Sequence, residues 1–430
     1  MRILLVLPWD LDHGRYRSKF SALVSYQPLT LATLASLVPK ELNAEIDVLD
    51  EMVQKNKKAK KHYDIVAISF VTSESRRAYE LAKMYKERGS YVVFGGYHTT
   101  FMPNEAKKHA DTIIIGAAEI AFPMFLKDFK RGKPKRVYEY QNIKPCDIGV
   151  PNRDILPKRK YVKFPTIIAS RGCPNNCEFC AISKMWKCEG REVGKVIDEI
   201  KGLKSKNMIF FDPNFFGNRE YVLKLMIEMS KLKIKWIGSA TMNVAKDDEL
   251  LSLAKDSGCY GLLIGFESMN RTSLKDARKG FNDPNDYKEA VAKIQSYGID
   301  VNGCFVLGFD SDTEEELLSL PDQINYLNLN LARFAILTPV PNSELFKRLE
   351  KEKRILTYDW HNYSQNKVVF QPENMTSERL EEIYRYVWKE TYKFKNIFKR
   401  VKCSKTKGLF AKLVLFCVNI GFKYLGVDLD

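Results

Sequence analysis

Three cysteines lie close together in the segment RGCPNNCEFC, where Cys173, Cys177 and Cys180 follow the spacing C-x3-C-x2-C. A loop this short lets three thiolates bind three corners of one iron–sulfur cubane. Because a 4Fe–4S cluster ordinarily has four cysteine ligands, a set of three leaves one iron open to a cofactor or a substrate. No fourth cysteine follows at a motif spacing. The sequence therefore predicts a cluster with one open iron.

A structural zinc ion is the alternative occupant of these cysteines. Structural zinc is bound by four N or S ligands, and the nearby sequence adds only Cys188 and no histidine. The spacing favours the cluster, and a non-catalytic zinc-binding scaffold is kept as a remote alternative hypothesis.

The cysteine spacing, with Phe179 directly before Cys180, resembles that of the radical S-adenosylmethionine (SAM) superfamily over roughly residues 165–345. The resemblance implies that the open iron binds the amino and carboxylate groups of SAM. It also implies that one electron, from a donor such as flavodoxin or ferredoxin, cleaves SAM to a 5'-deoxyadenosyl radical. That radical abstracts an unactivated hydrogen atom. The cofactor then carries the difficult step, and the protein positions and shields it.

The same resemblance implies several contacts with SAM. In IFFDPNFFGN, Asp212 and Asn214 are candidates for the SAM amine, although the Gly-Gly-Glu typical of the family is absent. In GLLIGFES, Glu267 and Ser268 are assigned to the ribose or the amino group. A carboxylate suits this role because it can accept hydrogen bonds from two hydroxyls.

Three further positions of the SAM site follow from the resemblance. Lys279 in DARKGF matches a Lys or Arg that pairs with the SAM carboxylate, and a solvated lysine at a helix end is the alternative. In VNGCFVLGFD, Gly303 and Gly308 are expected to let the backbone approach the adenine. The stretch LTPVPNSEL recurs in the same branch. Nothing in the sequence identifies a catalytic residue that acts on the substrate.

The segments YQPLTLATLASLVP, AEIDVLDE, GGYHTTFMPNEA and IIIGAAE together resemble the cobalamin-binding Rossmann-like domain of one branch of this superfamily. The resemblance implies cobalamin contacts at Gly95, Gly96, His98 and Glu119. The motif D-x-H-x-x-G is absent, because Asp12-His13-Gly14 has the wrong spacing. No histidine below cobalt is therefore expected, and His98 is either a hydrogen-bonding loop residue or a ligand contact.

Two reaction classes follow from this combination of domains. With cobalamin bound, the resemblance implies methylation of an unactivated carbon on a small molecule or a lipid. Without cobalamin, the same core would perform an oxidation, a cyclisation or a carbon–carbon coupling. Both hypotheses stay open from the sequence.

Alternating apolar runs and helical stretches must position these residues, and they predict an α/β protein. In residues 1–140, five apolar runs predict βαβ units around a Rossmann-like parallel sheet. In residues 165–350, six strand–helix repeats predict a partial (β/α)6 barrel with function on the loops after the strands. Residues 141–164, rich in Pro and charge, are predicted to be a linker. Residues 351–430 are predicted to be a small, helical and basic region.

The formal charge of +16 is not evenly spread. Residues 391–430 hold nine Lys or Arg against two Asp. The apolar run 413–422 is shorter than the roughly 20 residues that a membrane span needs. This composition suits an amphipathic segment on anionic lipid, and a helical cap with solvated lysines is an equal alternative. Nucleic acid ranks last, because no nucleic-acid-binding motif is present.

Length and cysteine usage place the chain in a broad class. The 430 residues suit two or three domains. Nine cysteines are an odd number for a disulfide framework, and the opening MRILLVLPWD lacks a signal-peptide layout. We therefore expect the cytoplasm, whose reducing conditions leave thiolates available for metal.

Overall fold

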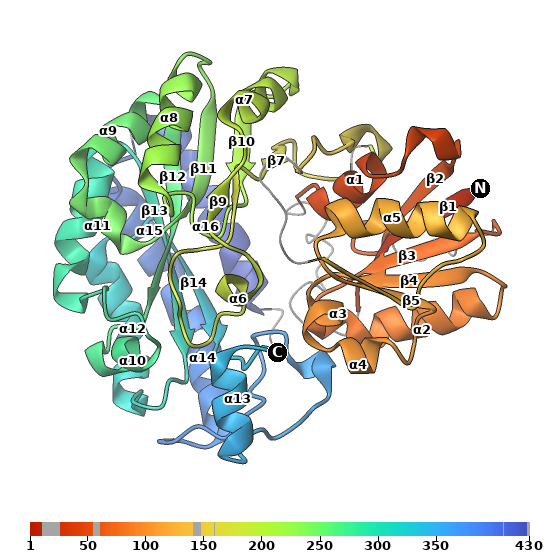
Figure 1. Ribbon diagram of the computed structural model, residues 1–430. Coiled ribbons are helices and arrows are strands. Elements are labelled where there is room, and N and C mark those ends of the chain that lie inside the picture. The colour runs from red at the N-terminus through yellow and green to blue at the C-terminus, as the bar shows by residue number, and fades with distance from the viewer. Residues whose placement is uncertain (11–25, 55–60, 141–147, 159, 407, 428–430) are drawn as a thin grey trace. The chain divides into compact units, whose positions relative to one another are not determined.

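The structure is a computed structural model that describes residues 1–10, 26–54, 61–140, 148–158, 160–406 and 408–427 (Figure 1). The described residues fall into two compact units. The first unit contains the N-terminal part through Thr166, together with Asp359–His361. The second contains Ile167–Tyr358 and the chain from Asn362 onward.

The first unit is built on a six-stranded parallel sheet with the strand order β2-β1-β3-β4-β5-β6. The strands are β1 (Arg2–Leu7), β2 (Glu45–Asp50), β3 (Ile65–Ser69), β4 (Tyr91–Gly95), β5 (Thr112–Gly116) and β6 (Val137–Tyr140). The order reverses at β1, as in doubly wound sheets. This confirms the predicted Rossmann-like fold, to which β6 is an addition that the sequence did not predict.

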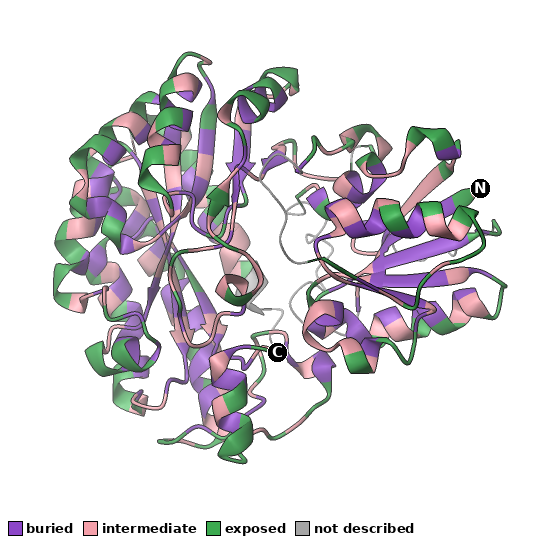
Figure 2. Ribbon diagram, in the orientation of Figure 1, coloured by how far each residue is buried: buried purple, intermediate pink, exposed green. Residues whose placement is uncertain are grey.

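Helices cover both faces of this sheet, so its strands are apolar on both sides. They are α1 (Leu29–Ser36), α2 (Ser75–Lys86), α3 (Tyr97–Phe101), α4 (Pro103–Ala106) and α5 (Ala118–Lys130). Leu5 of β1 packs in one core with residues of α1 and α5, whereas Leu4 packs in a second core with residues of α2. In Figure 2 the strands are accordingly buried and the outer helix faces exposed.

The second unit contains six parallel strands in sequence order, β14-β13-β12-β11-β10-β7. They are β7 (Thr166–Ile167), β10 (Asn207–Phe210), β11 (Lys235–Ala240), β12 (Cys259–Glu267), β13 (Asp300–Leu307) and β14 (Leu331–Ile336). The first residue of β7, Thr166, belongs to the first unit. β7 and β14 are not paired to each other, so the sheet is the predicted partial barrel (Figure 1). A short antiparallel pair, β8 (Ser170–Arg171) and β9 (Glu189–Gly190), flanks the cysteine loop.

Helices follow the strands and cover the outside of the sheet (Figure 1). They are α6 (Ile182–Met185), α7 (Val193–Gly202), α8 (Arg219–Ser230), α9 (Asp248–Asp256), α10 (Arg271–Asp276), α11 (Tyr287–Ser296), α12 (Glu314–Leu327), α13 (Glu344–Lys351), α14 (Ser377–Thr391), α15 (Phe394–Cys403) and α16 (Leu409–Val427). Polar caps set several starts: Asn218 caps α8, Asp247 caps α9 and Thr313 forms a capping box with Glu316.

The C-terminal helices complete the edge of the barrel sheet. Along β14, the Tyr392 hydroxyl donates to the carbonyl of Ala332 at 2.6 Å and accepts from its N–H at 3.1 Å. The Tyr384 hydroxyl of α14 donates to the carbonyl of Phe334 at 3.4 Å. An uncovered edge would leave these backbone groups unpaired. The tyrosine hydroxyls therefore form hydrogen bonds that a neighbouring strand would otherwise make with the edge of β14.

The compact units differ from the domain bounds that the sequence suggested. The described residues of the predicted linker 141–164 belong to the first unit, where Asn152 donates its N–H to the carbonyl of Ala32 at 2.9 Å and Tyr161 bonds Asp50 at 2.8 Å. Apart from Asp359–His361, residues beyond 350 share the core of the barrel, for example Tyr384 and Tyr392. Local composition does not reveal such long-range packing.

We predict that Tyr392→Phe destabilises the barrel unit. The substitution leaves the buried N–H and carbonyl of Ala332 without their partner, which costs about 2 kcal/mol. Urea unfolding followed by tryptophan fluorescence measures the loss, because Trp236 and Trp388 lie in the same core. Tyr386→Phe, at a position of α14 that is 42% exposed, is the matched control. Equal unfolding free energies for the two variants would contradict the prediction.

Candidate functional site

The cysteine loop is held at its base by backbone geometry. Ser170 pairs with Gly190 and Arg171 with Glu189 across β8 and β9. Gly172 follows with a φ of +76°, and a Cβ at this position would lie 2.3 Å from the carbonyl oxygen of Lys187. Only glycine fits this close approach. In the RGC start of the motif, Gly172 is therefore required by the backbone geometry, and Cys173 is the predicted cluster ligand.

The three thiols of the motif lie near one another. Cys177 is buried, and Cys173 and Cys180 are partly buried. Burial, together with the charges of the neighbouring thiols, raises the pKa of Cys177 to about 11. Burial also raises the pKa of Cys180, where the Cys173 charge adds to the effect. Thiols of this kind stay protonated until metal binding displaces the proton.

The arrangement of these thiols suits a cluster better than a single ion. Within the described ranges, no three His, Cys, Asp or Glu side chains converge closely enough to hold one metal ion. Structural zinc is bound by four N or S ligands, and this loop supplies three cysteines. In a cubane each cysteine binds a different iron. The donor set therefore fits three irons of a 4Fe–4S cluster.

Glu178, between two of the cysteines, fastens the loop to the rest of the barrel. Its N–H donates to the carbonyl of Ala277 at 3.0 Å, and its own carbonyl accepts from Leu345 at 3.0 Å. Its carboxylate accepts from Arg348 Nε of α13 at 2.7 Å. Arg348 also reaches Asp310, in the loop after β13, at 2.7 Å. The guanidinium of Arg348 on α13 thus binds one carboxylate from each of two barrel loops. Charge-assisted hydrogen bonds between arginine and carboxylates are among the stronger ones in proteins.

Phe179 packs where the loop turns toward Cys180. Its ring lies 6.1 Å from that of Phe309 in the loop after β13. It also contacts the small apolar cluster that contains Leu337 and Phe370. The structure therefore gives Phe179 a packing role beside Cys180, and its contact with SAM stays a prediction.

Lys279 and Glu267 form a buried ion pair at the end of β12. Lys279 Nζ lies 2.5 Å from Glu267 Oε1, and the two side chains are 6% and 11% exposed. The alternative that Lys279 is a solvated lysine at a helix end is therefore wrong. Burial opposes its charge, but Glu267, Cys177 and Cys304 outweigh that effect and raise the pKa of Lys279. The charged pair lies close enough to Cys177 to influence its ionisation.

The backbone around this pair is shaped to hold it. Glu267 has a φ of +65°, which is uncommon for a residue with a side chain. A Cβ at Gly265 would lie 2.4 Å from Glu267 Oε1 and 2.6 Å from Lys279 Nζ. Asn282 Nδ2 donates to the carbonyl of Gly265 at 3.0 Å, and the Tyr287 hydroxyl donates to that of Phe266 at 2.9 Å. No local sequence signal marks Gly265, Asn282 or Tyr287 as part of the site.

Asp212, predicted to contact the SAM amine, is 1% exposed and faces the start of the cysteine loop. Its oxygens accept from the N–H groups of Ala169 and Ser170 and from the Ser170 hydroxyl. Burial raises its pKa to about 6 against the effect of these bonds. Asp212 thus supports the strand that precedes the cysteines. Asn214 caps its own turn by accepting from the N–H of Phe216 at 3.2 Å, and the SAM contacts of both residues stay predictions.

The glycines expected near the adenine are explained by packing inside the protein. A Cβ at Gly303 would lie 2.7 Å from Leu329 Cδ1 and 3.3 Å from Phe266 Cδ2. Gly308 has a φ of +105°, and a Cβ there would lie 2.6 Å from Leu380 Cδ2 of α14. These contacts explain why both residues are glycine, and their approach to the adenine stays a prediction.

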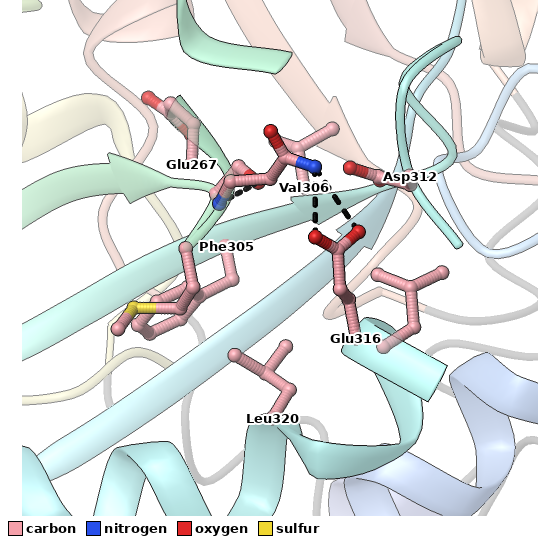
Figure 3. Close-up of a pocket in the computed structure, with 10 residues that line it drawn as sticks. Glu267, Phe305, Val306, Asp312, Glu316 and Leu320 are labelled. Carbon is pink, nitrogen blue, oxygen red and sulfur yellow. Dashed lines mark hydrogen bonds between the residues drawn. The ribbon is translucent and has the colours of Figure 1, made fainter. Parts of the chain in front are cut away.

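A small pocket opens between the carboxyl ends of β12 and β13 and helix α12. Figure 3 shows Glu267 on one side of it and Glu316 and Leu320 on the other. Ser268 also lines it, and its hydroxyl accepts from the N–H of Asn270 at 2.9 Å. Strand ends of this kind are the usual ligand-binding edge of parallel barrels. The pocket adjoins the ion pair through Glu267.

In the first unit, the residues predicted to contact cobalamin lie at the ends of β4 and β5. A Cβ at Gly95 would meet nothing within 4 Å, so the chain leaves open space there. Gly96 has a φ of +94°, and a Cβ on it would lie 2.7 Å from the carbonyl oxygen of Phe70. Glu119 lies in the first turn of α5 and is 9% exposed. Glycines at a strand end suit close approach of a large cofactor.

His98 is enclosed within the protein. It is 0% exposed, with Nε2 3.0 Å from the Tyr79 hydroxyl and Nδ1 3.3 Å from that of Thr72. Glu105 lies 3.6 Å from Nε2. Burial works against ionisation of Glu105, yet bonds from His98, Trp360 and Tyr79 lower its pKa to about 2. His98 therefore makes hydrogen bonds within the first unit, and its contact with cobalamin stays a prediction.

Family models match most of the chain. Residues 167–324 match the radical SAM superfamily, and residues 22–126 match the B12 binding domain. Residues 343–408 match a domain of unknown function, DUF4070. Over 389 residues the chain is 31% identical to bacteriochlorophyllide d C-12(1)-methyltransferase of Chlorobaculum tepidum, covering 87% of this chain and 84% of that protein. The chain belongs to the radical SAM superfamily, in the branch with a B12-binding domain.

A second relative and the solved structures agree with this assignment. An uncharacterized methyltransferase of Pyrococcus horikoshii is 30% identical, covering 91% of this chain and 92% of that protein. The cobalamin-dependent radical SAM enzyme OxsB has a TM-score of 0.71 at 16% identity, over 99% of this chain and 72% of that one. TsrM of Kitasatospora setae, with cobalamin and a cluster bound, has a TM-score of 0.67 at 15% identity, over 90% of this chain and 81% of that chain. These similarities confirm the fold.

The predicted cofactors are confirmed by this membership: a 4Fe–4S cluster, SAM and cobalamin. In the radical SAM enzyme described here, the three motif cysteines would hold the cluster, and Lys279 and Glu267 would face SAM. The loops after β4 and β5 would contact cobalamin. These individual assignments stay predictions.

We predict that Arg348→Met makes the cluster easier to remove. The change keeps most of the aliphatic length but leaves the partly buried carboxylates of Glu178 and Asp310 without this partner, and such losses cost about 3 kcal/mol. An iron chelator should then remove iron from the reconstituted protein several times faster. The control is Lys347→Met on the same helix, where the side chain is 58% exposed. Equal rates of iron loss would show that Arg348 does not hold the loop.

Proposed function

We propose that this enzyme methylates an unactivated carbon of a small, largely apolar molecule. The observation that carries the proposal is the buried Lys279–Glu267 pair beside Cys177, in a chain that also has a B12-binding domain. Relatives support the substrate class by their names. They include the bacteriochlorophyllide d methyltransferase and a hopanoid C-2 methylase of Rhodopseudomonas palustris, 30% identical over 53% of this chain. A tetrapyrrole or a polycyclic lipid is the substrate that we propose.

The chain's own residues bind and orient the cofactors. When bound, the cluster supplies the electron that generates the radical from SAM, and cobalamin supplies the route for the methyl group. Lys279 pairs with the SAM carboxylate, and Glu267 accepts from the ribose hydroxyls or the amino group. Their contact at 2.5 Å neutralises two buried charges. Phe179 and Phe309 exclude water beside the cysteine loop.

A second candidate is oxidative ring closure. An anaerobic magnesium-protoporphyrin IX monomethyl ester cyclase of Cereibacter sphaeroides is 25% identical over 84% of this chain. The same radical step would serve that reaction, in which no methyl group is added. The mass of the product distinguishes the two candidates.

We further propose that the enzyme works in the reducing cytoplasm, with electrons from a flavodoxin or ferredoxin type of donor. Apolar substrates of the proposed class accumulate in lipid. A location at the membrane surface, with the protein bound peripherally, would bring the enzyme to them.

We predict that Cys173→Ala, Cys177→Ala and Cys180→Ala each abolish SAM cleavage. Each removes one of only three ligands, so reconstitution under anaerobic conditions should yield less iron than the roughly four atoms of a complete cluster. Iron analysis and the release of 5'-deoxyadenosine measure the two effects. Cys403→Ala, at an exposed cysteine, is the control. Unchanged iron and cleavage in the three variants would refute the enzymatic assignment.

We predict that the full-length protein retains a corrinoid and transfers a labelled methyl group. Hydroxocobalamin added to the protein should remain after desalting and be visible in the absorbance spectrum. With SAM carrying a deuterated methyl group, the product of an apolar tetrapyrrole or hopanoid should gain that label. A product that loses hydrogen and gains no label would favour the cyclase type of reaction. Retention of no corrinoid would exclude the cobalamin-dependent route.

A further inference from the structure

Helices α15 and α16 present a row of apolar side chains to solvent. Leu409 is 88% exposed, Phe410 78% and Phe398 60%, and Leu413, Val414 and Val418 are also exposed. On α16 these residues stand at positions i, i+1, i+4, i+5 and i+9, which share one side of a helix. We call this set of six residues the α15–α16 face. Contiguous exposed apolar side chains of this kind mark an interaction surface.

The opposite side of α16 is fixed to the barrel unit. Asn419 is 0% exposed, accepts from Arg400 at 2.7 Å and donates to the carbonyl of Asn330 at 3.3 Å. The Phe422 ring lies 5.8 Å from that of Tyr392. These buried contacts fix the orientation of α16 about its own axis. The α15–α16 face therefore cannot turn inward without breaking them.

The charge around this face has a single sign. From Thr391 to Val427 the sequence contains nine Lys or Arg and no Asp or Glu. Lys402 and Lys405 are exposed, and Lys412, three residues after Leu409 on α16, lies beside the apolar row and is partly exposed. Lys423 lies over the Phe394 ring at 5.0 Å. A partner must therefore offer both apolar material and negative charge.

We infer that the α15–α16 face binds an anionic lipid surface, with α16 lying in the plane of the interface. Apolar side chains on one helix side with lysines around them are the composition of interfacial helices, and each lysine near an anionic leaflet adds to the attraction. One side of α16 is packed on protein, and no helix in the described part of the chain is long and apolar enough to span a membrane. The inference is independent of which group the enzyme transfers.

Two other partners fit this face less well. A second copy of the chain on a twofold axis would bring the same lysines against each other, and like charges repel. Nucleic acid would satisfy the lysines but leave Leu409, Phe410 and Leu413 without an apolar partner. Of these partners, only an anionic lipid surface offers both the apolar material and the negative charge that the α15–α16 face calls for.

The test is sedimentation of the full-length protein with lipid vesicles. Vesicles of equal parts phosphatidylcholine and phosphatidylglycerol should bind the protein, and pure phosphatidylcholine should bind it about tenfold more weakly. Phe410→Ser with Leu413→Ser, and separately Lys402→Glu with Lys412→Glu, should each reduce binding to the mixed vesicles by about tenfold or more. The control pair Leu356→Ser with Lys351→Glu changes an exposed leucine and an exposed lysine elsewhere on the same unit.

Iron content and SAM cleavage should be equal in all variants, which separates this inference from the proposed methylation. Absence of binding by the unmodified protein would overturn it. So would binding that resists the Phe410 and Leu413 changes, because that result indicates charge attraction alone. Light scattering that shows a dimer dissociated by the same changes would assign the face to a second copy of the chain.

Discussion

Lys279 and Glu267 carry opposite charges that are buried at the end of β12, and the neighbouring residues of the barrel are arranged to hold these charges together. Removing charges from water is costly unless the two groups pair closely. The pair needs the empty space above Gly265, where any side chain would overlap both charged groups. It also needs a left-handed backbone at Glu267. Asn282 and Tyr287 bond the carbonyls on either side and hold that backbone in place.

This pair also sets the electrostatic environment of the cysteine loop. Cys177 lies within reach of both charges, and burial keeps its thiol neutral. A cluster bound there would bring thiolate charge toward Lys279. SAM would bring its own carboxylate and ammonium groups to the same place. Each charge of the pair thus has the type of partner that a cofactor would also offer.

The sequence predicted the strands well because each is a short apolar run between polar turns. The apolar runs Ile3–Leu7, Ile65–Phe70, Gly261–Phe266 and Val301–Gly308 agree with β1, β3, β12 and β13 within one or two residues at each end. The cysteines were predictable because their chemistry depends on local spacing. The Glu178–Arg348 contact was not, since 170 residues separate its partners. The packing around Gly303 and Gly308 was not predictable for the same reason, because Leu329 and Leu380 become their neighbours only in the folded chain.

The C-terminal helices pack in succession, beginning at the open edge of the barrel sheet. An open barrel sheet has an edge at β14, and α14 supplies tyrosines that pair with it. α15 and α16 then pack on α14 through Arg400, Asn419 and Phe422, all of which lie on the inner sides of these helices. Because α16 is apolar around most of its circumference, fixing its inner side leaves apolar residues outside. A helix that only covered the barrel would carry polar residues on that outer side. Packing on the barrel therefore does not account for the exposed row of α16.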